Sequence, residues 1–576
     1  METLIKWREW GAAAFNEAKE QDKLILLDIS AVWCHWCHVM DGTSYSDPEV
    51  ASIIESRFIP VRVDTDRMPD VNERYNMGGW PTTAVLTPTG EVLLGATYVP
   101  PDKLRETLGS VETFYSENRE HIREKIVELT AKKAEELKSA AAPAGDISEN
   151  IPSYVLEELD RAYDPVHGGF GAEPKFPAPD AIDLLLTAYL DTGRRSYLDM
   201  AEKTLNGMSS YGMYDQVMGG FFRYSVKSDW TVPHFEKMLD VNAGLIVSYV
   251  NAWRITGKGP YMETVKKTLD YVDGWLWQEA GYFGGSQDAD EEYYKLTLEE
   301  RLDRTPPSVD GTMFTNLNAR TAYAYLTAWE AFGETKYKDR AFAALEFILS
   351  KTKGEGGGLY HFYDLGPDRH GLLTDQSATL RTLLYAFQLT GEKRWLAEAL
   401  SLLEFTERTL WDAGHGGFFD LPGDPGAVGA LADRTKQMAE NSEMSQSLKV
   451  LYLLTGDERY REMSRKCLLS FAKSYRDYGF MASNYANAVD FHLKPPVELT
   501  FTGTLGGPDM AALVDAAGKR FLPRRVVRMM DYARDREELR KKGLNTDGPA
   551  GVYVCRDYVC RERITDPGAL GDELAA

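Results

Sequence analysis

Residues 24–37 read Leu-Ile-Leu-Leu-Asp-Ile-Ser-Ala-Val-Trp-Cys-His-Trp-Cys, and this stretch decides the fold of the first part of the chain. The continuous apolar run Leu24–Leu27 is typical of a strand that is buried on both faces. At Cys34 the pattern changes to that of a helix start, where free N–H groups and the helix dipole favour a thiolate. Cys37 follows one turn later, close enough to resolve a mixed disulfide. The stretch therefore predicts thiol–disulfide chemistry.

The surrounding residues predict an α/β domain over residues 1–140. A helix is expected from Trp10 to Gln21, and a second buried strand from Phe58 to Val63. The runs Ala84–Thr87 and Glu91–Leu94 flank a Pro-Thr-Gly turn and predict a hairpin. A charged helix is expected from Pro101 to about Ser139, and residues 140–146 are typical of a linker. Within this domain Asp28 lies on the strand before the cysteines, where it could accept a proton from Cys37.

Two other interpretations of the cysteine pair stay open at this point. Cys34, His35, Cys37 and His38 are all zinc-ligand types, but one helical turn does not easily present four tetrahedral ligands. A second pair, Cys555 and Cys560, could complete such a site. The pair could also belong to a thioredoxin-shaped scaffold without redox activity. We predict no metal ion and no other cofactor.

The fifth cysteine and the overall composition point to a soluble protein of two or three domains. Cys467 lies in helical pattern and is expected to be a small core residue. The 576 residues exceed the size at which one core stops growing. A net charge of −23 argues against nucleic acid or an anionic membrane as the main partner.

The chain also lacks the usual signs of export or membrane insertion. No apolar run reaches the roughly 18 residues of a transmembrane helix, and the start Met1–Trp7 has no signal-peptide pattern. We therefore expect a cytoplasmic location, where thiols stay reduced.

Residues 150–495 are almost entirely helical in pattern and are broken by recurring glycine-rich turns. The spacing of these turns, roughly 50–75 residues, suits a helical hairpin plus a loop and predicts a repeat architecture. Six helix pairs would form a closed (α/α)6 toroid of twelve helices; a stacked open solenoid is the alternative. We favour the toroid because the loops carry aromatic and acidic residues rather than a uniform consensus. The turns are His167–Phe170, Met218–Phe222, Tyr282–Gly285, Gly356–Tyr360, His415–Phe419 and Tyr478–Phe480.

The last segment, residues 497–576, is predicted to be a small α/β unit that carries the second cysteine pair. Strands are expected at Val497–Phe501, Arg525–Met529 and Gly551–Cys555, with a helix from Pro508 to Phe521.

The first domain resembles thioredoxin, in which an acidic strand residue precedes Trp-Cys-x-x-Cys at the offset seen for Asp28. Thioredoxins carry a cis-proline that faces the cysteines, and Trp80-Pro81 occupies that position. The resemblance implies that Cys34 attacks, that Cys37 resolves and that Pro81 holds the substrate backbone. The tryptophans on either side of Cys34, Trp33 and Trp36, would shape an apolar docking surface.

Longer motifs narrow the resemblance to the family of thioredoxin-like domain of unknown function 255. They are Trp33–Met40, Asp47–Val50, Val63–Asp64, Pro69–Val71 and Gly78–Pro81.

The helical region also resembles this family, through the loops Asp164–Pro177, Asp229–Leu239 and Ser286–Asp290. The resemblance implies the twelve-helix barrel of six-hairpin glycosidases and N-acylglucosamine 2-epimerase, which bind sugars in a bowl of aromatic and carboxylate groups. Carboxylates and histidine at one mouth suit acid–base work or polyol binding, although each could instead cap a helix. The candidate substrate-binding residues are Lys175, Trp230, His234, Glu236, Lys237, Asp288, Asp290 and Asp375.

The sequence therefore supports three hypotheses for the function of this protein. The first is a thiol–disulfide oxidoreductase with a protein thiol or disulfide as partner. The second is a carbohydrate-binding or epimerase-like enzyme in the toroid. The third is an interaction scaffold in which neither site turns over.

Overall fold

The computed structural model describes residues 4–139, 145–557 and 559–575. It divides into two compact units: residues 1–142 with 420–435, and residues 143–419 with 436–576. Of the predicted linker, residues 140–144 lie outside the described part. Among the helices that are described, none has both the length and the apolar character needed to cross a bilayer.

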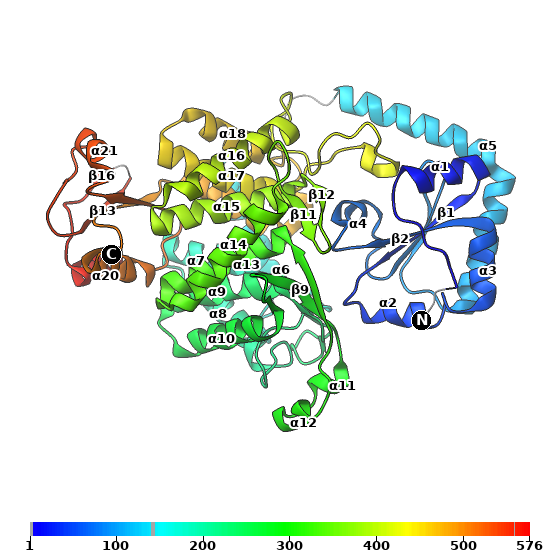
Figure 1. Cartoon of the computed structure of the whole chain (residues 1–576), viewed down its shortest axis with the longest axis horizontal. Helices are drawn as coiled ribbons and strands as arrows, with labels where there is room; N and C mark the ends of the chain where they lie inside the picture. Colours follow the sequence, from blue (N-terminus) through cyan, green and yellow to red (C-terminus); the bar gives the residue numbers. More distant parts are fainter. Residues whose placement is uncertain (1–3, 140–144, 558, 576) are drawn as a thin grey trace. The chain divides into compact units, whose positions relative to one another are not determined.

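The first unit is a thioredoxin-like fold built on a four-stranded sheet of order β2-β1-β3-β4 (Figure 1). The strands are β1 (Leu24–Ser30), β2 (Phe58–Asp64), β3 (Thr82–Leu86) and β4 (Val92–Ala96). β1 pairs in parallel with β2 and antiparallel with β3, and β3 and β4 form the expected hairpin. The central position of β1 explains its continuous apolar run, because both of its faces are covered.

Among the residues that the structure describes, five α-helices accompany this sheet. The helices are α1 (Ala12–Gln21), α2 (His35–Gly42), α3 (Pro48–Arg57), α4 (Pro69–Tyr75) and α5 (Pro101–Ser139). Helices α3 and α4 were not predicted from the sequence. α3 begins in the usual way, since the Asp47 side chain accepts the N–H groups of Glu49 and Val50.

Residues 420–435 belong to the first unit, although the sequence placed them in the toroid. The reason is a set of polar contacts with α4. Tyr75 Oη accepts the Ala430 N–H at 2.8 Å, and the Arg74 guanidinium lies 2.7 Å from Asp420. The backbone also approaches closely here, because a Cβ atom on Gly90 would lie 2.5 Å from the Cα atom of Gly429. Sequence periodicity carries no information on such contacts between distant segments.

The second unit contains a closed ring of helices, twelve of them within the described residues. Each of the six inner helices packs on the next, and the last packs on the first, which confirms the toroid over the open solenoid. The inner helices are α7 (Pro179–Thr192), α9 (Leu239–Thr256), α13 (Thr315–Phe332), α15 (Leu373–Thr390), α17 (Met438–Thr455) and α19 (Ser483–Leu493). The outer helices are α6 (Asn150–Ala162), α8 (Arg195–Ser210), α10 (Gly259–Tyr271), α14 (Thr335–Phe347), α16 (Lys393–Leu410) and α18 (Glu458–Leu469).

An amide clamp recurs where the glycine-rich turns meet the inner helices. Asn242 of α9 accepts the N–H of Phe221 and donates to its carbonyl, so that one side chain pairs both backbone groups of the loop residue. Asn318 binds Phe283 in the same way. Buried backbone groups need such partners. The clamp recurs in two further pairs, Gln376 with Leu359 and Asn441 with Phe418.

Short strands and two short helices lie in the loops between these helices. They are β5 (Tyr224–Ser225), β6 (Pro233–His234), β7 (Lys237–Met238), β8 (Trp277–Gln278), β9 (Tyr282–Gln287), α11 (Glu291–Tyr294), α12 (Leu298–Leu302), β10 (Val309–Phe314), β11 (Tyr360–Tyr363) and β12 (Pro367–His370). These strands include a six-stranded sheet of order β12-β11-β10-β9-β7, in which β8 also pairs with β9.

The carboxy-terminal segment is an α/β subdomain within the second unit. Its sheet has the order β14-β13-β15-β16, with β13 parallel to β14 and antiparallel to β15. The elements are β13 (Val497–Gly503), α20 (Pro508–Gly518), β14 (Arg525–Asp531), α21 (Arg536–Lys541), β15 (Gly551–Arg556), β16 (Val559–Cys560) and α22 (Pro567–Ala575).

Candidate functional site

The two cysteines lie at the start of helix α2, just after strand β1. Cys34 is the residue that caps the amino end of α2, and its Sγ accepts the N–H of Cys37 at 3.1 Å. The two side chains are joined in a disulfide, with 5.2 Å between their Cα atoms. Both residues are largely buried. A sulfur in this position lies at the positive end of the helix dipole and accepts a backbone N–H, an arrangement that stabilises negative charge.

The two tryptophans beside the disulfide have different surroundings. Trp33 is buried, and its indole N–H donates to Asp66 Oδ2 at 2.6 Å. It therefore packs inside the domain and does not form part of the expected docking surface. Trp36 is 46% exposed and packs beside Tyr98. The Trp80-Pro81 bond, which enters β3, is cis. Only Trp36 of the two tryptophans is therefore open to a docking partner.

Asp28 is buried in the middle of β1 and is paired with a residue that the sequence analysis missed. Arg62 Nε lies 2.7 Å from Asp28 Oδ2, and the same guanidinium reaches Asp41. Burial raises the pKa of Asp28 to about 6, against the lowering effect of Arg62. Arg62 stands opposite Asp28 in the register of β1 and β2. The available signal was a charged residue inside the otherwise apolar run Phe58–Val63.

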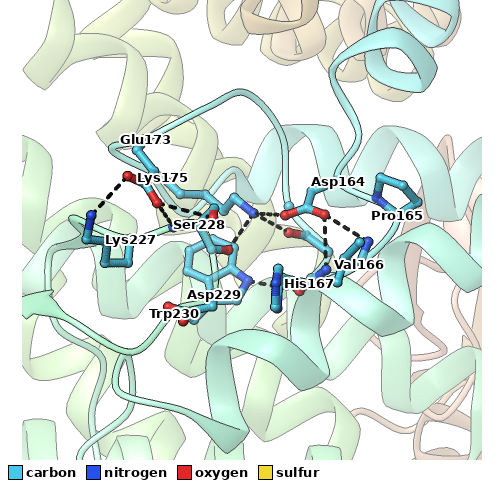
Figure 2. Close-up of polar contacts among 12 residues, drawn as sticks. Asp164, Pro165, Val166, His167, Glu173, Lys175, Lys227, Ser228, Asp229 and Trp230 are labelled. Carbon is cyan, nitrogen blue, oxygen red and sulfur yellow. Dashed lines mark hydrogen bonds and ion pairs between the residues drawn. The ribbon is translucent and has the colours of Figure 1, made fainter.

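Lys175 in the toroid is fully buried, and all of its hydrogen-bonding capacity is used within the protein (Figure 2). Its Nζ donates to Asp164 Oδ2 at 2.7 Å and to the carbonyl groups of Gly168 and Ser228. Trp230 is buried too, and its indole donates to the His167 carbonyl. Lys175 and Trp230 thus hold two loops together, and their expected role in substrate binding stays a prediction.

Lys237 has the same role one repeat later. Its Nζ lies 2.7 Å from Asp215 Oδ2 and donates to the Gly219 carbonyl. Burial lowers the pKa of Lys237 to about 8. A third copy follows, in which Lys436 binds Asp412 and the Gly416 carbonyl. A lysine that links an aspartate to the first glycine of a Gly-Gly turn is thus a repeated structural feature, and the expected contact of Lys237 with a substrate stays a prediction.

His234 and Glu236 lie together, next to a stack of aromatic rings. The His234 ring stacks on Tyr224 at 4.4 Å, and Tyr224 stacks on the exposed Phe176 at 4.6 Å. Glu236 Oε1 lies 3.6 Å from His234 Nδ1. Glu236 is 2% exposed, and its Oε2 is a buried atom with no hydrogen-bond partner among the described residues. An unpaired buried carboxylate oxygen is costly unless a ligand or water completes it.

The three aspartates among the candidate substrate-binding residues all bind protein groups: Asp288 and Asp290 bind neighbouring backbone, and Asp375 binds residues that are distant in the sequence. Asp290 caps helix α11 by accepting the N–H of Tyr293, which is the alternative that the sequence left open for it. Asp288 accepts the N–H of Ala289. Asp375 is fully buried between His361 Nδ1, at 2.9 Å, and the N–H of Asn316.

A charged cluster inside the ring was missed by the sequence analysis. Arg320 and Arg381, from α13 and α15, each lie 3.5 Å from the carboxylate of Glu443 on α17. Both arginines keep more than a third of their side chain exposed. Nearby, Asp183 of α7 lines a cavity of about 240 Å³ together with Arg381. Burial and the neighbouring Asp180 raise the pKa of Asp183 to about 7. The available signal was the presence of charged residues on apolar inner helices.

The described residues contain no group of three or more His, Cys, Asp and Glu side chains placed to hold a metal ion. Cys555 and Cys560 form a disulfide with each other. The zinc interpretation of the two cysteine pairs therefore has no ligand set in the described part of the chain. Cys467 is fully buried, as expected for a core residue.

Comparison with known proteins agrees with this geometry. Residues 1–134 match the family described as Thioredox_DsbH, protein of unknown function, DUF255. The amino-terminal part of the chain is a DUF255 domain. The similarity extends beyond this DUF255 domain, because the chain is 25% identical to human spermatogenesis-associated protein 20 over 98% of its length and 89% of that protein.

Two further matches concern the separate units. Thioredoxin H2 of Arabidopsis thaliana is 30% identical over 84 residues, which are 14% of this chain and 60% of that one. A sugar epimerase from a ruminal bacterium matches 57% of this chain and 86% of its own, with a TM-score of 0.48 and 16% identity. The similarity to the epimerase concerns the fold alone.

Proposed function

We propose that the DUF255 domain catalyses thiol–disulfide exchange with protein partners. The observation that carries the proposal is the position of Cys34 Sγ, which caps helix α2 and accepts the N–H of Cys37. This arrangement favours the thiolate as the attacking and leaving group. The exposed Trp36 offers an apolar surface beside it. The similarity of this domain to thioredoxins supports the same chemistry.

In the reducing direction, the Cys34 thiolate attacks one sulfur of a partner disulfide and the second partner sulfur leaves as a thiolate. The Cys37 thiol then loses its proton and attacks Cys34 Sγ, which releases the partner as a dithiol and leaves the Cys34–Cys37 disulfide. We assign Asp28 the acceptance of the Cys37 proton and Pro81 the positioning of the partner backbone. In the cytoplasm, where we expect the chain to act, this is the favoured direction.

A redox titration tests the proposal. Full-length protein is equilibrated in glutathione buffers of graded potential, and the thiol state of the Cys34–Cys37 peptide is read by differential alkylation and mass spectrometry. We expect one reversible two-electron transition that Cys34→Ser abolishes and Cys467→Ala leaves unchanged. The proposal fails if the pair never changes state across the range, or if the oxidised protein does not exchange with a reduced protein dithiol.

We propose as a second candidate that the toroid binds a polyol such as a neutral sugar at Glu236. The supporting observation is the buried, unpaired Glu236 oxygen beside His234, with the rings of Tyr224 and Phe176 next to it. A carboxylate accepts hydroxyl hydrogen bonds, and aromatic faces suit the apolar side of a sugar ring.

Calorimetric titration with a panel of neutral mono- and disaccharides tests this candidate. Glu236→Gln should weaken binding by roughly tenfold or more, because a charge-assisted hydrogen bond is lost. Glu173→Gln is the matched control, since Glu173 pairs with Lys227 in an exposed loop. Absence of binding by every sugar, or equal binding by Glu236→Gln, would remove the candidate.

A further inference from the structure

The carboxy-terminal subdomain repeats the strand topology of the DUF255 domain. The first sheet has the order β2-β1-β3-β4 and the last has the order β14-β13-β15-β16, in which the strands occur in the same sequence along the chain. In both, the first and second strands pair in parallel over seven residues, and the third and fourth strands follow antiparallel. A helix follows the first strand in both cases and another helix follows the second.

The helix after the first strand begins at a cysteine in the DUF255 domain, but the corresponding helix of the carboxy-terminal subdomain begins at a glycine. Strand β1 ends at Ser30 and Cys34 caps α2 four residues later. Strand β13 ends at Gly503, and the residue four positions later, Gly507, caps α20. The cysteines of the subdomain lie instead on the hairpin of β15 and β16, where Cys555 stands directly opposite Cys560.

These two cysteines form a disulfide that is open to solvent on one side. Cys560 is exposed and Cys555 is half-buried, whereas Cys34, Cys37 and Cys467 are all buried. A thiolate that approaches from solvent would therefore reach the sulfur of Cys560 first. Accessibility of this kind distinguishes exchangeable disulfides from structural ones.

The hairpin does not depend on the disulfide for its backbone pairing. The Arg561 N–H donates to the Val554 carbonyl at 2.9 Å, and Ile564 and Val552 exchange both of their backbone hydrogen bonds. These bonds fasten the segment that follows Cys560 to strand β15. Reduction would thus remove one covalent link and leave the edge of the sheet paired.

We propose that residues 497–575 form a second thioredoxin-like fold whose redox centre is the hairpin disulfide Cys555–Cys560, a two-electron acceptor for dithiols. One thiolate of the dithiol attacks Cys560 Sγ, the S–S bond breaks, and Cys555 leaves as a thiolate that takes up a proton. The second thiolate of the dithiol then displaces Cys560, which is also protonated. The reductant becomes a disulfide, and the subdomain holds two thiols.

The test uses full-length Cys34→Ser/Cys37→Ser protein, so that its outcome is independent of the proposed function of the DUF255 domain. Dithiothreitol is the probe, and the Cys555–Cys560 peptides are followed by differential alkylation and mass spectrometry without denaturant. We expect complete reduction and reversible reoxidation while the native far-ultraviolet circular dichroism is retained. A disulfide that is reduced only after the chain is unfolded would overturn the proposal and indicate a structural link.

The direction of attack is tested with two variants of the Cys34→Ser/Cys37→Ser protein, each of which replaces one cysteine of the Cys555–Cys560 pair. Oxidised glutathione should modify Cys560 in Cys555→Ser about tenfold faster than it modifies Cys555 in Cys560→Ser, because only Cys560 is exposed. Cys467 serves as the internal control and should stay unmodified in both. Equal rates at the two positions, or a faster rate at Cys555, would contradict the assigned order of steps.

Discussion

Two buried residues of this protein show that hydrogen-bond partners, rather than burial alone, separate a structural charged group from one suited to proton transfer. Asp28 and Lys175 are both almost completely buried and both are ion-paired. Lys175 has every N–H satisfied by oxygen acceptors, which leaves it no capacity for a ligand. Asp28 is held against Arg62, yet burial still raises the pKa of its carboxyl to about 6. A carboxyl that titrates near neutral pH suits proton transfer.

The raised pKa of Asp28 predicts a pH-dependent stability of the first unit. Because the folded protein binds the proton more tightly than the unfolded chain, this contribution is complete below pH 4 and is lost as the pH rises toward 6. The size is on the order of 2–3 kcal/mol. Asp28→Asn should remove the slope. Hydrogen exchange of β1 peptides at pH 4.5 and 7, corrected for intrinsic rates, measures it; parallel profiles for the two proteins would contradict the prediction.

Replacement of Lys175 by methionine should destabilise the toroid by about 3–5 kcal/mol, because Asp164 and two carbonyl groups lose their shared donor. Lys227→Met is the control, since the Lys227 side chain is more than half exposed. Urea unfolding of the second unit measures the effect. If Lys175 instead served only a ligand, the variant would keep its stability.

At the scale of elements, the toroid depends on contacts between each inner helix and the glycine-rich turn before it. The amide clamps connect α9, α13, α15 and α17 to the loop residues Phe221, Phe283, Leu359 and Phe418. Each clamp satisfies a buried N–H and a buried C=O that lie outside any helix. In each of these turns, a residue beside the glycines therefore depends on an Asn or Gln side chain of the following helix for its backbone hydrogen bonds.

Asn318→Leu should leave the N–H and C=O of Phe283 unsatisfied and cost about 2–4 kcal/mol. The measurement is the urea midpoint together with hydrogen exchange of the β9 peptide. Asn316→Leu, on the same helix turn but less buried, is the comparison. Loss of protection in both variants to the same degree would contradict a specific role of the clamp.

At the scale of the second unit, Glu330 joins the carboxy-terminal subdomain to the ring. This carboxylate contacts Arg525 of β14 at 2.6 Å and Arg254 of α9 at 2.7 Å, and it accepts the Tyr385 hydroxyl. Despite burial, the nearby guanidinium groups lower the pKa of Glu330 to about 2. The helix α20 also lies close, because a Cβ atom on Gly518 would approach the Glu330 carbonyl oxygen to 2.2 Å.

Glu330→Gln should destabilise the second unit by about 3–5 kcal/mol at pH 7, because two buried guanidinium groups lose their counter-charge. The lowered pKa means that the wild-type contribution is present above pH 4.5 and is lost as the pH falls toward 2. The difference in urea midpoint between wild type and variant should therefore shrink in acid. A difference that grows as the pH falls would contradict this account.

The sequence by itself determined the parts of this protein that rest on local pattern. The strand Leu24–Ser30 with Cys34 and Cys37 at a helix start predicted the thioredoxin-like fold, because burial of a central strand leaves a continuous apolar run. The spacing of the glycine-rich turns predicted the helical hairpins. Neither inference required contacts between residues that are distant in the chain.

Only the tertiary structure decided which charged residues are free and how distant segments combine. Charged residue types of the kind found in ligand sites occur at Lys175, Lys237 and Asp290. In the folded protein the two lysines are paired with aspartates within 3 Å, and Asp290 accepts an N–H at a helix start. The contact of residues 420–435 with α4, and the topology shared by the first and last sheets, also emerged only there. Hydrogen-bond satisfaction and strand order depend on groups tens to hundreds of residues apart, and local periodicity does not encode them.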